Sequence, residues 1–109
     1  MHEPSSANLA AEAAAQLRPL YGERLLGIYE PLSPLFGDDE ERPDVQLIAL
    51  LAGHIDTYAG IARVSGPASE LSLDHALFVS IYPVGDEDLL DNTGRTPVGL
   101  RRSDLRRVA

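Results

Sequence analysis

Apolar residues recur at helical spacing near the start of the chain and form continuous runs farther along it. The first set consists of Leu9, Ala13, Leu17 and Leu20. This spacing puts them on one face and predicts a helix over Ser6–Tyr21. We expect Ser5 or Ser6 to cap the helix, since a serine oxygen accepts a free N–H of the first turn. Pro19 should kink or break the last turn, and Gly22 should end the helix.

Three runs rich in Leu, Ile and Val predict strands. The first is Arg24–Glu30, and the last is Ala76–Val84, whose Pro83 should lie at an edge of the sheet or outside its ladder. Between them, Asp44–Ala52 begins polar and is apolar thereafter, as in a strand buried on both faces. A long acidic loop, Leu32–Pro43, separates the first two strands. Its DDEER run lacks the glycine and the alternating oxygen ligands of a calcium loop.

A second helix should connect the last two strands. Apolar residues recur at helical spacing over Ile55–His75. Gly66 and Pro67 interrupt this segment, because proline removes a backbone donor and clashes with the preceding turn. We therefore expect two helical pieces with a break near Ser65.

The order of these elements is helix, strand, strand, helix, strand. It predicts an α/β (α+β) fold of two layers, in which a small mixed β-sheet has helices packed on one face. The 109 residues suffice for one domain, which we assign to residues 1–94, followed by an Arg-rich C-terminal tail over residues 95–109. In the remaining segments, Asp86–Asp91 predicts one short helical turn, and Ser103–Val108 predicts a last short helix.

Composition excludes several classes of chemistry. The chain has no cysteine, which excludes disulfides, thiolate nucleophiles and iron–sulfur clusters. It also has no lysine, which excludes a phosphate-loop lysine. The three histidines, His2, His54 and His75, lack metal-ligand spacing. No apolar run is long enough to cross a bilayer, and the N-terminus lacks the pattern of a signal peptide. We expect a soluble cytoplasmic protein without membrane partners.

Charge is unevenly distributed along the chain. The formal net charge is −8, yet the last fifteen residues hold five Arg and one Asp. The acidic body should repel nucleic acid, which is therefore a disfavoured partner. The Arg tail could bind phosphate, lie on its own acidic body or contact a neighbouring subunit. The last two alternatives are favoured, because the arginines are few and no aromatic residue is interleaved with them.

The loop and second strand carry a family resemblance. The segment LLGIYEPLSPLFGDDEERPDVQLIALL has a strand, a long loop and a strand that opens with Asp. With the flanking segments YGERLLGIY, ELSLDHALFVSIYPV and RTPVGLRRSDL, it resembles the minimal nucleotidyltransferase family, which has the DNA polymerase β-like fold. The resemblance covers roughly residues 16–107. It implies a nucleotidyltransferase-like fold whose active members transfer a nucleotidyl group with Mg²⁺.

The family's catalytic positions are altered in this chain. Where the family has a Gly-Ser phosphate turn, Glu30–Leu35 reads EPLSPL, whose prolines remove backbone donors. The family's second strand opens Asp-x-Asp, which places two carboxylates on one face to bind Mg²⁺. Here Asp44 remains and Gln46 replaces the second acid. The third carboxylate is also missing, because Ser80 or Tyr82 occupies its place.

The resemblance thus implies a catalytically degenerate nucleotidyltransferase-like protein that acts by protein–protein interaction or self-association. An example is the antitoxin-like member of a two-gene toxin–antitoxin module, which pairs with a small helical protein. We expect no transferase activity and no cofactor. The candidate partner-binding residues are Arg101, Arg102, Arg106 and Arg107.

Two alternatives stay open. One is a residual nucleotidyltransferase that moves a nucleotidyl group from an NTP to a protein or small molecule. It would hold Mg²⁺ with Asp44 and acids borrowed from Asp38–Glu41. The other is a structural module within an obligate oligomer, because a short sheet leaves edges to cover.

Overall fold

A four-stranded mixed sheet forms the centre of the molecule. The computed structural model describes residues 6–33, 43–89 and 100–109 of the chain. The strands are β1 (Leu25–Pro31), β2 (Val45–Leu51), β3 (Val79–Gly85) and β4 (Leu105–Arg107). They lie in the order β3-β2-β1-β4; β1 is antiparallel to β2 and β4, whereas β2 is parallel to β3. The expected strands β1, β2 and β3 are therefore confirmed, with shifted ends.

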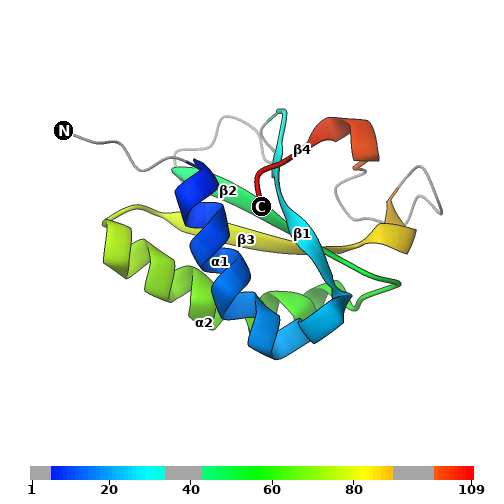
Figure 1. Cartoon of the computed structure of the whole chain (residues 1–109), viewed down its shortest axis with the longest axis horizontal. Coiled ribbons are helices and arrows are strands. Elements are labelled where there is room, and N and C mark those ends of the chain that lie inside the picture. The colour runs from blue at the N-terminus through cyan, green and yellow to red at the C-terminus, as the bar shows by residue number, and fades with distance from the viewer. Residues whose placement is uncertain (1–5, 34–42, 90–99) are drawn as a thin grey trace.

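Two helices, α1 (Ser6–Tyr21) and α2 (Thr57–His75), cover one face of this sheet (Figure 1). Their apolar sides meet alternate strand residues in one core, including Leu17, Leu47 and Leu71, none of which is exposed. At the end of α2, His75 Nε2 contacts Glu12 Oε2 of α1 at 2.6 Å. Among the described residues, no helix has the length and hydropathy needed to cross a bilayer. The predicted two-layer fold with helices on one face is confirmed.

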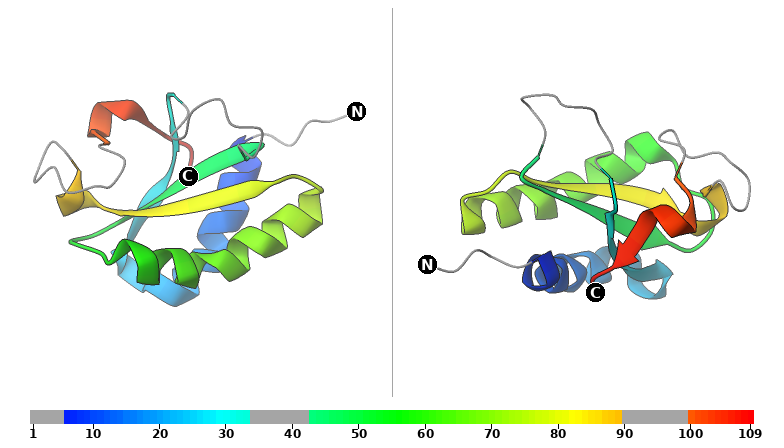
Figure 2. Two further views of the ribbon diagram at one scale, coloured as in Figure 1. Left: turned by 180° about the vertical axis from the view of Figure 1, so that it is seen from behind. Right: turned by 90° about the horizontal axis from the view of Figure 1, so that it is seen from above.

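The strand β2 is buried on both faces, as its apolar run predicts. Leu47, Ala49 and Leu51 pack under the helices. Ile48 and Leu50 point to the opposite face, where they join a second apolar cluster with residues beyond the ends of the sheet, such as Leu89 and Leu100. Figure 2 shows these later segments, η2 (Asp86–Asp88) and η3 (Arg102–Asp104), near one end of the strands. Among the described residues, Leu89, Leu100 and Leu105, which follow β3 in the chain, thus pack against this second face.

The helix α1 has the predicted bounds. The break expected at Pro19 does not occur, because Leu17 and Tyr21 on either side of the proline are both buried in the core. Gly22 follows at φ +57°, a left-handed conformation that glycine adopts without strain, so the predicted stop is confirmed. Ser5 lies outside the described residues. A short 3₁₀ turn, η1 (Gly22–Arg24), then leads into β1.

The predicted break in α2 is wrong. The helix runs without interruption through Gly66 and Pro67. Core contacts on both sides of the proline explain this continuity, because Val64 and Leu71 pack against the same face of the sheet. Tertiary burial thus outweighs the local penalty of one missing backbone bond. The start of α2 is fixed by Asp56, whose side chain accepts from the N–H groups of Tyr58 and Ala59.

Two other expected boundaries are also corrected. The last core strand begins at Val79 and not at Ala76, because Ala76 ends α2 at φ 53° and the Ser72 hydroxyl accepts from the Val79 N–H at 2.9 Å. The expected helix over Ser103–Val108 is wrong as well. Only η3 is helical there, and residues 105–107 form β4, since β1 offers an antiparallel edge to pair with.

Two further expectations agree with the structure, and two others concern residues that the structure does not describe. Pro83 lies in the edge strand β3, as expected, and η2 corresponds to the short turn expected over Asp86–Asp91. The central part of the acidic loop, residues 34–42, lies outside the described residues. The expected boundary between domain and tail, at residues 94 and 95, also lies outside them.

Candidate functional site

The start of β2 follows Asp44, which the resemblance led us to expect to be a remnant of a metal-binding site. Asp44 Oδ2 accepts from the Phe78 N–H at 2.8 Å. In return, the N–H groups of Asp44 and Val45 donate to the Phe78 carbonyl at 2.9 and 3.1 Å. Asp44 therefore joins the beginning of β2 to the beginning of β3, and one of its carboxylate oxygens is already used.

Gln46 and Ser80, the two positions at which the resemblance led us to expect lost acids, lie together. They are direct partners in the parallel β2–β3 ladder. Gln46 Nε2 donates to the carbonyl of Leu47 at 3.0 Å and to that of Ser80 at 3.4 Å. Its Oε1 is buried without a partner among the described residues. The described part of the chain contains no group of three or more acids or histidines suited to a metal ion; Asp38–Glu41 lie outside it.

Two of the four tail arginines contact the chain's own β1. Arg106 forms an ion pair with Glu30, which faces it across the β1–β4 ladder. The Arg102 guanidinium lies over the Tyr29 ring, 5.7 Å from its centroid. The other two make local contacts: Arg107 Nε donates to the Ala109 carbonyl at 3.2 Å, and the Arg101 N–H donates to Asp104 at 2.8 Å. The four residues are thus spread from Arg101, just before η3, to the end of β4, and two of them contact β1.

A pocket of about 160 Å³ opens at the opposite end of β2, where the strand leads into α2. Its wall comes from the end of α1, the turn before β1, the loop after β2 and the first two turns of α2. The polar side chains in this wall are Tyr21, Arg24, His54, Asp56 and Arg63. They come from two stretches of the chain, residues 21–24 and 54–63, which are 30 residues apart in sequence, so only the fold brings the two stretches together.

Two arginines and a tyrosine form one side of this pocket. Arg24 Nη2 donates to the carbonyls of Ala52 and His54 at 3.3 and 3.4 Å, which orients its guanidinium over the loop after β2. The Arg63 guanidinium lies over the Tyr21 ring, 5.4 Å from its centroid. The Tyr21 hydroxyl is buried and has no partner among the described residues. Burial raises the pKa of Tyr21, and the charges of Arg63 and Arg24 oppose this rise.

A histidine and three acids form the adjoining loop contact. His54 Nδ1 lies 2.5 Å from Oδ1 of the buried Asp88, whose Oδ2 accepts from the Ile55 N–H at 3.0 Å. His54 Nε2 lies 3.7 Å from Glu87, and Asp86 accepts from the Gly53 N–H at 2.7 Å. These contacts fasten the loop after β2 to η2, at the carboxyl ends of the two parallel strands.

The sequence alone did not point to this pocket. Its residues form no local motif. The positions of His54 and His75 in the sequence indicate only that these two histidines flank one helix. The available signal is positional: His54 and Asp56 follow a buried strand and precede a helix, and ligands commonly bind at that junction. Comparisons with protein-family models, curated proteins and solved structures gave no significant match to this chain.

Proposed function

We propose that this chain is a nucleotidyltransferase-like scaffold without transferase activity, which acts in the cytoplasm by binding another protein. By its resemblance, the partner is a small helical protein, as in a two-gene toxin–antitoxin module. The element order helix, strand, strand, helix, strand and the parallel pairing of β2 with β3 are compatible with this proposal.

One observation carries the loss of transferase activity. The only acid left at the family's metal-binding positions, Asp44, uses an oxygen to hold the Phe78 N–H. The neighbouring positions are Gln46 and Ser80, whose side chains supply no charge. Nucleotidyl transfer needs a cluster of carboxylates, because the bound metal ions neutralise the charge that develops on the phosphate. These three side chains do not provide such a cluster.

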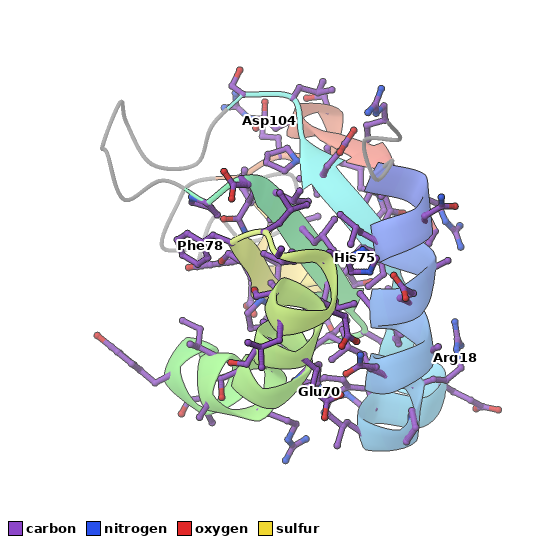
Figure 3. All side chains as sticks on the ribbon, turned by 90° about the vertical axis from the view of Figure 1, so that its left-hand side faces the viewer. Arg18, Glu70, His75, Phe78 and Asp104 are labelled. Atoms are coloured by element: carbon purple, nitrogen blue, oxygen red, sulfur yellow. The ribbon has the colours of Figure 1, made fainter. Side chains whose placement is uncertain are left out.

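A groove beside the β3 edge supports a role in protein binding. It measures about 570 Å³ and lies between α2 and the first half of β3. Three large apolar side chains on it are exposed: Ile61 by 41%, Leu73 by 83% and Phe78 by 52%. Figure 3 shows Phe78 at the side of the molecule, pointing away from the core. Such a set of apolar side chains favours a docking site over a freely solvated surface.

The chemistry around the groove favours a basic helix as its occupant. Glu70 and Asp74 are exposed on α2, and the whole chain carries a net charge of −8, so a basic partner is attracted. Addition of a strand to the β3 edge is less favourable, because Pro83 lacks the N–H that such pairing uses. An amphipathic helix needs only an apolar groove.

The first experiment tests the absence of transferase chemistry. The purified chain is titrated with ATP, GTP, CTP and UTP at millimolar Mg²⁺ in a calorimeter. We expect no binding that depends on Asp44. Mg²⁺-dependent binding that disappears in Asp44→Ala would instead establish the residual nucleotidyltransferase.

The second experiment tests protein binding through the groove. The chain is co-expressed with the product of the adjacent gene, and the affinity of the purified pair is measured by calorimetry. We expect Leu73→Asp to weaken binding at least tenfold, because it places a charge in the apolar groove. Leu32→Asp, at a residue 63% exposed at the end of β1, is the matched control. Equal affinities of the two variants would contradict this groove as the docking site.

A further inference from the structure

We propose that the pocket at the carboxyl end of β2 binds a small phosphate monoester. The donors are the guanidinium groups of Arg24 and Arg63 and the hydroxyl of Tyr21. This inference goes beyond the protein-binding function and uses none of the residues at the start of β2. By the rise of a strand, the two places are roughly 20 Å apart.

The position in the fold is one where phosphates bind in many α/β proteins. The strands β2 and β3 are parallel, so their carboxyl ends meet at one edge of the sheet. The crevice outside such ends accepts ligands because the following helix begins there. The 19-residue helix α2 begins at this point, and residues of its first two turns line the pocket.

The two arginines give the pocket a cationic wall on a chain with a net charge of −8. Arg24 is held by the carbonyls of Ala52 and His54, which use only its Nη2. Arg63 is exposed and makes its ring contact with Tyr21. Guanidinium groups match phosphate oxygens in geometry and stay charged, so a pair of them in one pocket favours a phosphate ligand.

The Tyr21 hydroxyl is the observation that most directly indicates a missing ligand. The side chain is only 9% exposed, and its hydroxyl has no acceptor among the described residues. Buried hydroxyls nearly always have a partner, because burial without one is unfavourable. We expect the exposed Arg63 side chain, which lies over the Tyr21 ring, to move toward a bound anion. This movement would uncover the Tyr21 side chain, so that a ligand oxygen reaches its hydroxyl. Three donor groups then match the three terminal oxygens of a phosphate monoester.

The other lining residues agree with this ligand. The Asp56 carboxylate accepts from the N–H groups of Tyr58 and Ala59, so the helix N-terminus compensates its charge. Leu51 and Ile55 supply an apolar wall, where the carbon side of an ester can lie. Free inorganic phosphate lacks that part and should bind more weakly than an ester.

The test compares three probes at constant ionic strength: inorganic phosphate, phenyl phosphate and acetate. Binding is followed by calorimetry and by backbone amide shifts in NMR spectra of the ¹⁵N-labelled chain. We expect phenyl phosphate to bind at least tenfold more tightly than acetate and more tightly than phosphate, with the largest shifts at the start of α2. Shifts centred on the C-terminal arginines, or equal affinities for all three probes, would overturn the proposal.

Two variants assign the binding to this pocket. Arg63→Gln removes one guanidinium that makes no hydrogen bond within the described fold, and we expect it to weaken phenyl phosphate binding at least tenfold. Arg18→Gln is the matched control, since Arg18 is exposed on α1 and lies outside the pocket (Figure 3). Tyr21→Phe should weaken binding by a smaller factor while the chain stays folded. Unchanged affinity in Arg63→Gln would overturn the assignment.

Binding of a phosphate monoester in this pocket can be distinguished from the proposed scaffold function. Binding in the pocket should need no Mg²⁺ and should persist in Asp44→Ala, whereas a residual transferase should lose NTP binding in that variant. An NTP that binds through its phosphates in the pocket would lose affinity in Arg63→Gln instead.

Discussion

The two ends of β2 use polar residues in different ways. At its start, Asp44 accepts from the N–H of Phe78, and Gln46 Nε2 donates to carbonyls of β2 and β3, while Gln46 Oε1 has no partner among the described residues. Beyond its end, Arg63 makes only a ring contact, and the Tyr21 hydroxyl has no partner among the described residues. The sequence drew attention to the start of the strand, where the hydrogen bonds of Asp44 and Gln46 have structural roles. The other end has no sequence motif and has polar groups to spare. Each end thus has one buried polar atom without a partner among the described residues, and the two ends differ in their surroundings, because the Tyr21 side chain shares its pocket with the guanidinium groups of Arg24 and Arg63.

The largest loss of stability is expected from Gly85→Ala, at the carboxyl ends of β2 and β3. A Cβ at Gly85 would lie 2.3 Å from the Gly53 carbonyl oxygen and 2.7 Å from Asp88 Oδ2. Because the backbone itself must move, we expect a loss of about 3 kcal/mol in the free energy of unfolding, measured with urea. Gly66→Ala is the control, since a Cβ there meets nothing within 4 Å. A loss no larger than that of the control would show that the two loops are not in close contact.

The next largest effect is expected from Asp88→Ala. This substitution leaves the Ile55 N–H and the His54 ring without their buried acceptor. Hydrogen bonds to a charged group are worth about 1.5–3 kcal/mol each, and we expect a loss of about 2 kcal/mol in stability. Asp74→Ala, at an exposed position of α2, is the control and should change stability little. Equal losses of stability in the two variants, measured by urea unfolding, would contradict a structural role for the hydrogen bonds of Asp88.

A smaller loss of stability is expected from a substitution at the start of β2. Asp44→Ala removes the acceptor of the Phe78 N–H, and we expect about 1 kcal/mol of destabilisation. Asp44→Asn should retain most of the stability, because its amide oxygen can accept the same bond. If Asp44 served only as a metal ligand, both variants would leave the stability of the metal-free chain unchanged.

Unlike the preceding substitutions, Tyr21→Phe should not lower the free energy of unfolding. The hydroxyl that it removes has no partner, so we expect unchanged stability or a gain of up to about 1 kcal/mol in the free chain. With saturating phenyl phosphate, the wild-type chain should gain more than the variant in melting temperature. A destabilised Tyr21→Phe variant without ligand would reveal a hydrogen bond to this hydroxyl within the chain.

The smallest effect concerns alkaline pH. Burial raises the pKa of Tyr21 and of Tyr82 above the ordinary value of 10.0. The folded chain then keeps these protons where the unfolded chain releases them. Stability should be constant below pH about 10 and fall as the pH rises through the folded-state pKa values. Arg63→Gln should raise the pKa of Tyr21 further and leave that of Tyr82 unchanged, as followed by tyrosinate absorbance. Equal titration in both proteins would contradict the closeness of Arg63 and Tyr21.

Sequence patterns predicted the strongly periodic elements well. The spacing of Leu9, Ala13 and Leu17 predicted α1 and its buried face, although Leu20 of the same set is 45% exposed. The apolar run of β2 indicated burial on both faces. The break expected at Pro67 was wrong, because local propensity cannot include the core contacts of Val64 and Leu71. The helix expected over Ser103–Val108 was wrong for a similar reason: its alternative depends on an edge of β1 that is distant in sequence.

The sequence by itself determined the two-layer class, the buried central strand and the absence of cysteine and lysine chemistry. These features depend on local periodicity and composition, which a single chain displays directly. The tertiary structure alone decided that Asp44 joins two strands, that β4 pairs with β1 and that Tyr21, Arg24, His54 and Arg63 share one pocket. Each of these depends on contacts between segments 30 or more residues apart, which no local pattern encodes.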